Sequence, residues 1–74
     1  MDNKTLILSI RNCIKQKGLV QGYVAEKAGF SYQQFSDMLN GRKLLLAEYI
    51  PRIANALGVT ANEIYYGANE NKAG

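Results

Sequence analysis

The sequence lacks histidine and tryptophan, and it holds one cysteine and one proline among its 74 residues. Without histidine, the chain has neither the commonest general base nor the usual partner of a Ser or Cys nucleophile, which excludes most hydrolase sites. Cys13 alone can form no internal disulfide, and it cannot belong to a Cys/His zinc site. We therefore expect no enzymatic activity, no metal or other cofactor and no small-molecule ligand.

Long hydrophobic runs are also missing. The apolar run at residues 6–10 contains Ser9 and is too short to span a bilayer or to form the core of a signal peptide. This predicts a cytoplasmic protein without a membrane partner. A hydrophobic fraction of 47% supports one small core. We expect a single domain at residues 1–67, followed by a disordered tail at residues 68–74 that is rich in Gly, Ala and Asn.

Charge gives only a weak indication of the partner. Nine Lys/Arg against six Asp/Glu leave a net charge of +3, a surplus that many ordinary domains share. Three of the basic residues, Lys4, Arg11 and Lys15, lie on one side of the first helical segment. They predict either a solvated face or a contact with a polyanion.

Hydrophobic residues recur with a helical period in five segments separated by glycines, and no segment alternates like a strand, which predicts an all-α domain. The first segment ends at Gly18, and the second runs from Gln21 to Ala28 before Gly29. The apolar face of the first segment consists of Leu6, Ile7, Ile10, Cys13 and Ile14.

The third segment carries the clearest start signal. Ser31 is followed three residues later by Gln34, which predicts a capping box, and Phe30 and Phe35 occupy the positions of a hydrophobic staple. We expect this helix to run to about Leu39, before Asn40-Gly41.

The last two segments follow the same logic. In the fourth, apolar residues precede Gly58, and Pro51 either kinks the helix or marks the first turn of its stronger half. In the fifth, Thr60 and Glu63 predict a second capping box, flanked by Val59 and Ile64 as a staple, and we expect this helix to stop before Gly67.

Residues 21–40 combine the features of a helix-turn-helix. Ala25 lets two helices approach closely, and Gly29 accepts the left-handed conformation that the turn requires. The second helix of the pair has an apolar underside formed by Phe35, Met38 and Leu39. Its opposite face is polar and consists of Gln33, Ser36, Asp37 and Asn40, with Tyr32 at the border.

Four blocks of the sequence carry a resemblance to a known family. They are Gly18-Leu19-Val20-Gln21, residues 24–31 (VAEKAGFS), residues 38–43 (MLNGRK) and residues 53–60 (IANALGVT). In this order and spacing they resemble the lambda-repressor-like, or XRE, helix-turn-helix family, which includes phage repressors and Cro proteins. The resemblance covers roughly residues 6–66. It implies a compact five-helix domain that binds double-stranded DNA with its third helix in the major groove.

The resemblance also implies which residues contact DNA. Gln21 matches a phosphate contact at the start of the second helix, and Asn40, Arg42 and Lys43 match backbone contacts after the third. The positions that match the groove-facing surface are Tyr32, Gln33, Ser36 and Asp37. The chemistry is suitable, because Gln can pair with adenine, Asp can accept from cytosine N4, and Arg or Lys neutralises phosphate.

These implications predict a sequence-specific transcriptional regulator, a repressor of phage or mobile-element type that binds an inverted repeat as a homodimer. One such module buries little surface, and two-fold symmetry doubles the contacts. We expect the dimer contact at Ile64, Tyr65 and Tyr66, because two adjacent tyrosines on one helix cannot both face the core.

The sequence departs from the family pattern at three places. Val20 stands where the family prefers Ser or Thr, Asp37 brings a negative charge to the groove-facing surface, and Leu44-Leu45-Leu46 replaces a polar, proline-containing entry to the fourth helix. These departures keep open an alternative, in which the fold acts as a protein-interaction adaptor of antitoxin-like or anti-repressor-binding type.

Overall fold

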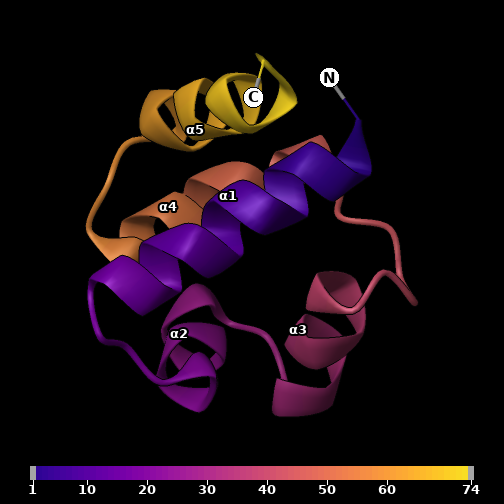
Figure 1. Cartoon of the computed structure of the whole chain (residues 1–74). Helices are drawn as coiled ribbons and strands as arrows, with labels where there is room; N and C mark the ends of the chain where they lie inside the picture. Colours follow the sequence, from indigo (N-terminus) through magenta and orange to yellow (C-terminus); the bar gives the residue numbers. More distant parts are fainter. Residues whose placement is uncertain (1, 74) are drawn as a thin grey trace.

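A computed structural model describes residues 2–73, and the side chains of residues 2–69. The described chain contains no strand, as the periodicity predicted. Its elements are α1 (Asn3–Gln16), α2 (Gln21–Ala28), α3 (Tyr32–Leu39), the short 3-10 helix η1 (Ala47–Tyr49), α4 (Ile50–Leu57) and α5 (Ala61–Ala73). Figure 1 shows α1 in the middle, packed along α5, with α4 behind it and with α2 and α3 on the side away from α5.

The core draws on all five α-helices. Four of the side chains that are completely inaccessible to solvent are Ile10, Phe35, Ile50 and Ile53, from α1, α3 and α4. Phe30 is also buried, and its ring stacks on that of Phe35 with 6.0 Å between centroids, which confirms the predicted staple. None of the described helices is long and apolar enough to cross a membrane.

Both predicted capping boxes are present. The Ser31 hydroxyl accepts a hydrogen bond from the Gln34 main-chain N–H at 3.1 Å, and the Gln34 side chain accepts one from the Ser31 N–H at 3.4 Å. Thr60 and Glu63 exchange the equivalent bonds at 3.1 and 2.8 Å. These bonds satisfy main-chain donors that a helix start leaves without partners, and they define where α3 and α5 begin.

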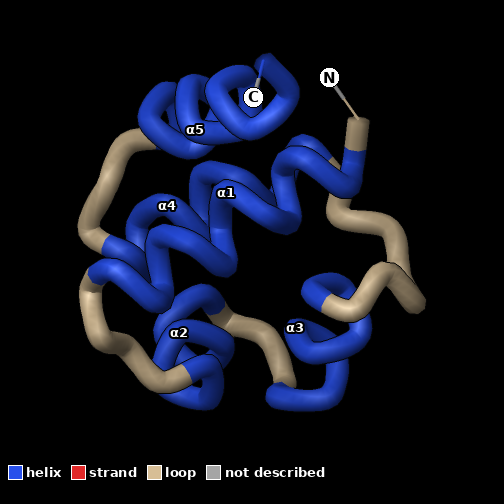
Figure 2. The backbone as a smooth tube through the Cα atoms, viewed as in Figure 1, coloured by secondary structure: helices blue, strands red, loops and turns tan. Residues whose placement is uncertain are grey.

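The segment between α3 and η1 is the longest loop among the described residues (Figure 2). Asn3 ties it to α1, since its amide donates to the Leu45 carbonyl at 2.8 Å and accepts from the Leu45 N–H at 3.1 Å. Leu45 is buried, whereas Leu44 is 66% exposed, so the leucine run is not exposed as a whole. Pro51 lies in the first turn of α4, which confirms one of its two predicted roles.

The predicted end of the last helix was wrong. α5 continues through Gly67 to Ala73, so the helix extends into the segment that was expected to follow the domain. Gly67 does not stop the helix and lies where α5 meets α1: a β-carbon there would stand 2.6 Å from Ser9 Oγ. Ala68 is completely buried one residue later. Residue 74 lies outside the described residues.

Candidate nucleic-acid interface

The turn between α2 and α3 is stabilised from outside the helix pair. Gly29 adopts the predicted left-handed conformation, with φ of 83°. Arg52 of α4 donates from Nε to the Ala28 carbonyl and from Nη2 to the Gly29 carbonyl, both at 3.0 Å. Its guanidinium also lies 4.1 Å from the centroid of the Phe30 ring. Arg52 therefore connects the end of α2 to the residues that lead into α3, a role that the sequence analysis missed.

The start of α2 lies beside the start of α3. Val20 provides no side-chain cap and is 72% exposed, and the half-buried Gln21 opens the helix. A β-carbon on Gly22 would stand 3.7 Å from the Tyr32 ring. The predicted phosphate contact Gln21 and the predicted groove contact Tyr32 thus belong to neighbouring helix ends.

The two faces of α3 divide as predicted. Phe35, Met38 and Leu39 are buried on its underside. The opposite side carries the five predicted residues, of which Tyr32, Gln33 and Asn40 are exposed and Ser36 and Asp37 are half-buried.

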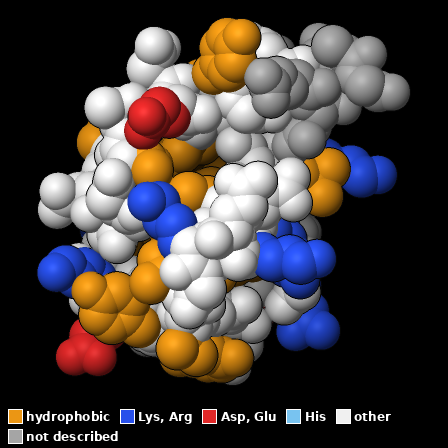
Figure 3. Space-filling model, turned by 60° about the vertical axis from the view of Figure 1, so that its left-hand side comes forward, with side chains coloured by type: hydrophobic (Ala, Val, Ile, Leu, Met, Phe, Trp, Pro, Cys, Tyr) orange, Lys and Arg blue, Asp and Glu red, His pale blue; other side chains and the backbone are white. Residues whose placement is uncertain are grey.

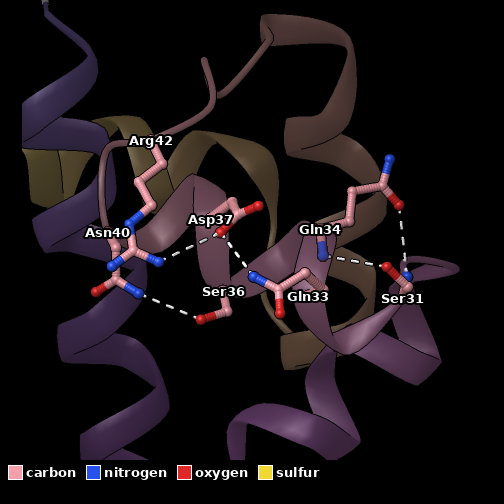
Figure 4. A network of polar contacts seen from close by, with 7 residues as sticks. All are labelled: Ser31, Gln33, Gln34, Ser36, Asp37, Asn40 and Arg42. Carbon is pink, nitrogen blue, oxygen red and sulfur yellow. Dashed lines mark hydrogen bonds and ion pairs between the residues drawn. The ribbon is translucent and has the colours of Figure 1, made fainter.

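These polar residues contact one another in pairs along the helix (Figure 4). Gln33 Nε2 donates to Asp37 Oδ1 at 2.9 Å, and Asn40 Nδ2 donates to Ser36 Oγ at 3.2 Å. Arg42 Nη1 lies 3.8 Å from the same Asp37 oxygen. The Asp37 side chain is 18% exposed and that of Arg42 is 72% exposed. The negative charge on this face is therefore accompanied by a cation and by an amide donor.

The loop after α3 folds back onto the helix end. Gly41 takes a left-handed conformation with φ of 78°, and the N–H groups of Arg42 and Lys43 both donate to the Asp37 carbonyl, at 2.8 and 3.1 Å. This places the main chain of both residues at the end of α3, where the exposed Arg42 side chain lies near Asp37 and Lys43 lines a groove against α1. From α1, Arg11 Nη1 donates to the Leu39 carbonyl at 3.1 Å and satisfies a terminal acceptor of α3.

The basic residues are distributed over α1, α2, α4 and α5 and the loops after α1 and α3. On the face drawn in Figure 3 they are separated by hydrophobic and uncharged side chains. Of the basic trio on α1, only Arg11 has a described hydrogen bond to α3, while Lys4 lines a groove between α1 and the loop after α3. The groove measures 590 Å³ and is also lined by Leu8, which is 43% exposed, and by Leu44.

The predicted dimer residues lie on α5, on the opposite side of the domain from α2 and α3 (Figure 1). Ile64 is buried in the core, so its side chain is not accessible to a partner. Tyr65 is half-buried against the core, and Tyr66 is 66% exposed. Tyr66 lines a second groove, between α1 and α5, together with Cys13, where burial raises the pKa of the Cys13 thiol above its ordinary value.

Comparisons with known proteins identify the fold and the family. Two solved structures of the clp gene regulator ClgR from Corynebacterium glutamicum are similar to this chain. One is 24% identical, with a TM-score of 0.86 over 96% of this chain and 76% of that chain. The other is 23% identical, with a TM-score of 0.85 over 93% and 90%. No curated protein matches.

A family model described as Helix-turn-helix matches residues 10–64, which is most of the chain. The chain therefore belongs to the XRE or lambda-repressor-like helix-turn-helix family, a family of DNA-binding transcription regulators.

Proposed function

We propose that this protein is a sequence-specific transcriptional regulator that reads double-stranded DNA with α3 in the major groove. The observation that carries the proposal is the position of the basic loop: its N–H groups bond to the Asp37 main-chain carbonyl, and the Arg42 guanidinium lies 3.8 Å from the Asp37 carboxylate on the polar face of α3. A major groove admits one α-helix, and polar side chains such as that of Gln match base edges. The capping box at Ser31 and the Arg11 bond at Leu39 hold both ends of α3 in place.

In this proposal, different residues contact the base edges and the phosphate backbone. Gln33 and Tyr32 reach base edges, with Ser36 beside them. Gln21, Asn40, Arg42 and Lys43 contact the phosphate backbone at the two ends of the helix pair. Phosphate contacts supply most of the affinity and the salt dependence, whereas base contacts supply the sequence preference.

The regulator acts as a homodimer on an inverted repeat, and as a repressor of phage or mobile-element type that occupies its operator. One module of this size buries too little surface for a selective site, and a second copy doubles the contacts. The exposed Tyr66 ring supports a contact through α5. A transcriptional regulator must be in the same compartment as the DNA that it binds, which supports a cytoplasmic location.

Selection from random duplex DNA, followed by sequencing, tests the proposal. The expected product is a palindrome whose half-sites lie about one helical turn apart, roughly 34 Å. Affinity for it should fall steeply between low and physiological salt, because bound counterions are released from the phosphates. If no duplex is bound even at low salt, the proposed function is wrong.

A second candidate is an adaptor that binds another protein, and the groove between α1 and the loop after α3 favours it. Exposed Leu8 and Leu44 line this groove together with Lys4, Arg11 and Lys43. Such a surface suits an apolar segment with acidic residues at its edges. An interface dominated by the two leucines would depend much less on salt than phosphate binding does.

A further inference from the structure

The geometry points to adenine as the base that Gln33 reads, with Asp37 as a positioning residue that orients the Gln33 amide and reads no base itself. This inference rests on the proposed function and deepens it by naming one base in the target. It concerns a pair of residues four positions apart on α3, whose side chains therefore lie one above the other on the same face.

The first step is the orientation of the amide. A carboxylate can only accept hydrogen bonds, so the Gln33 group that faces Asp37 Oδ1 at 2.9 Å must be the NH₂ group. The side-chain carbonyl then points away from Asp37, as Figure 4 shows. The electrostatic character of Asp37 thereby decides between the two amide orientations, which have nearly the same shape.

The second step is the pattern that Gln33 still presents. One N–H is used by Asp37, and the other N–H and the carbonyl oxygen remain, one donor beside one acceptor. In the major groove, adenine offers the complementary pair, the N7 acceptor and the N6 donor. Guanine offers two acceptors, so its O6 would face the Gln33 carbonyl. Cytosine and thymine each offer only one complementary group.

The third step concerns Asp37. Its side chain is only 18% exposed, and one of its oxygens is shared between Gln33 and Arg42. Because the Arg42 guanidinium is 3.8 Å away, beyond a good hydrogen bond, its donors remain available for a phosphate. Arg42 thus offsets the carboxylate charge near the DNA without displacing Gln33 from it. Asp37 can therefore lie in the groove-facing surface and influence base preference only by orienting the Gln33 amide.

A mutant cycle on the selected duplex tests the inference. Affinities are measured for all base pairs at each position with wild type, Gln33→Ala, Asp37→Ala and the double variant. Wild type should prefer adenine at one position by roughly 5- to 150-fold. Gln33→Ala and Asp37→Ala should each reduce this preference at the same position, and Asp37→Ala should add no further loss of preference once Gln33 is replaced.

Two further variants separate orientation from charge. Asp37→Asn keeps the size but can donate as well as accept, so the Gln33 amide can turn over, and guanine should be tolerated at the adenine position. Arg42→Ala should weaken binding to every duplex and leave the adenine preference intact. Circular dichroism spectra of all variants check that they are folded.

Several outcomes would overturn the inference. One is loss of a cytosine preference at another position in Asp37→Ala, independent of Gln33, since Asp37 would then read a base. Others are an equal loss on all sequences in Asp37→Ala, or a wild type with no adenine preference at a Gln33-dependent position. If no duplex is bound, the proposed function fails separately. In that case NMR spectra of the free protein test whether Asp37 orients the Gln33 amide. The side-chain NH₂ signals of Gln33 should shift in Asp37→Asn, and unchanged signals would contradict the positioning role of Asp37.

Discussion

Ser9 of α1 and Gly67 of α5 are in direct contact where the two helices meet. A β-carbon on Gly67 would lie 2.6 Å from Ser9 Oγ, closer than van der Waals contact permits. The same hydroxyl donates a buried hydrogen bond of 2.8 Å to the Ile64 carbonyl. The absence of a side chain at Gly67 therefore lets α5 approach α1 and lets the hydroxyl keep its acceptor.

Gly67→Ala should destabilise the protein by about 1–2 kcal/mol. Alanine improves the helix propensity by up to about 1 kcal/mol, but its methyl group displaces the Ser9 hydroxyl from its buried acceptor, which costs about 1–3 kcal/mol. Urea unfolding monitored by circular dichroism measures the difference.

The Ser9→Ala background provides the control. Without Oγ, the nearest Ser9 atom to the new methyl group is Cβ at 3.6 Å, an ordinary contact. In this background Gly67→Ala should be neutral or stabilising. Gly22→Ala, whose methyl group would meet only Tyr32 at 3.7 Å, should stabilise by roughly 0.5–1 kcal/mol. A stabilising Gly67→Ala in the wild-type background would contradict the packing role of Gly67.

Glycine explains where the sequence analysis succeeded and failed for the fold. Gly29 and Gly58 end their helices with positive φ, as expected. Gly67 was assigned the same role, yet it lies inside α5, where the nearby Ser9 of another helix leaves no room for a side chain. A glycine that ends a helix and a glycine at a contact between helices cannot be distinguished from the local sequence. Caps such as the Ser31–Gln34 box depend on residues three positions apart, so local sequence contains the information that predicts them.

The same distinction holds for the candidate site. The two faces of α3 follow from its helical period. The contact of Gln33 with Asp37 could also be predicted from the sequence, because the residues are four positions apart on one helix. The roles of Arg52 and Arg11 were not predictable in this way. Their acceptors are main-chain carbonyls 24 and 28 residues away, and any residue type provides a carbonyl.

Arg52→Ala should destabilise the protein by about 1–3 kcal/mol, because it removes two hydrogen bonds at the end of α2 and a cation–π contact with Phe30. Arg52→Lys should recover little of this loss, since an ammonium group cannot reproduce the planar fork that reaches both carbonyls. Urea unfolding of both variants measures the effect. Full recovery in Arg52→Lys would mean that charge alone matters at this position.

Replacing Arg42 and Lys43 together by alanine should lower affinity for all duplexes. If each side chain neutralises one phosphate, the slope of log affinity against log salt concentration should decrease in magnitude by about 2. Fluorescence anisotropy over a series of salt concentrations measures the slope. The control is the pair Lys17→Ala and Lys27→Ala, which removes the same charge beside α2 and α4. An equal change of slope in the control would remove the loop from the DNA contact.

Tyr66→Ala should shift the protein from dimer towards monomer, because this ring is the most exposed apolar group among the described side chains of α5. If Tyr66 is a hot spot of the interface, its truncation costs about 2 kcal/mol or more, which is about a 30-fold weaker association. Sedimentation equilibrium measures it, and affinity for the full palindrome should fall while affinity for an isolated half-site stays the same. Tyr23→Ala, at a tyrosine of α2 that is 48% exposed, is the matched control. Unchanged association in Tyr66→Ala would place the dimer contact away from this tyrosine.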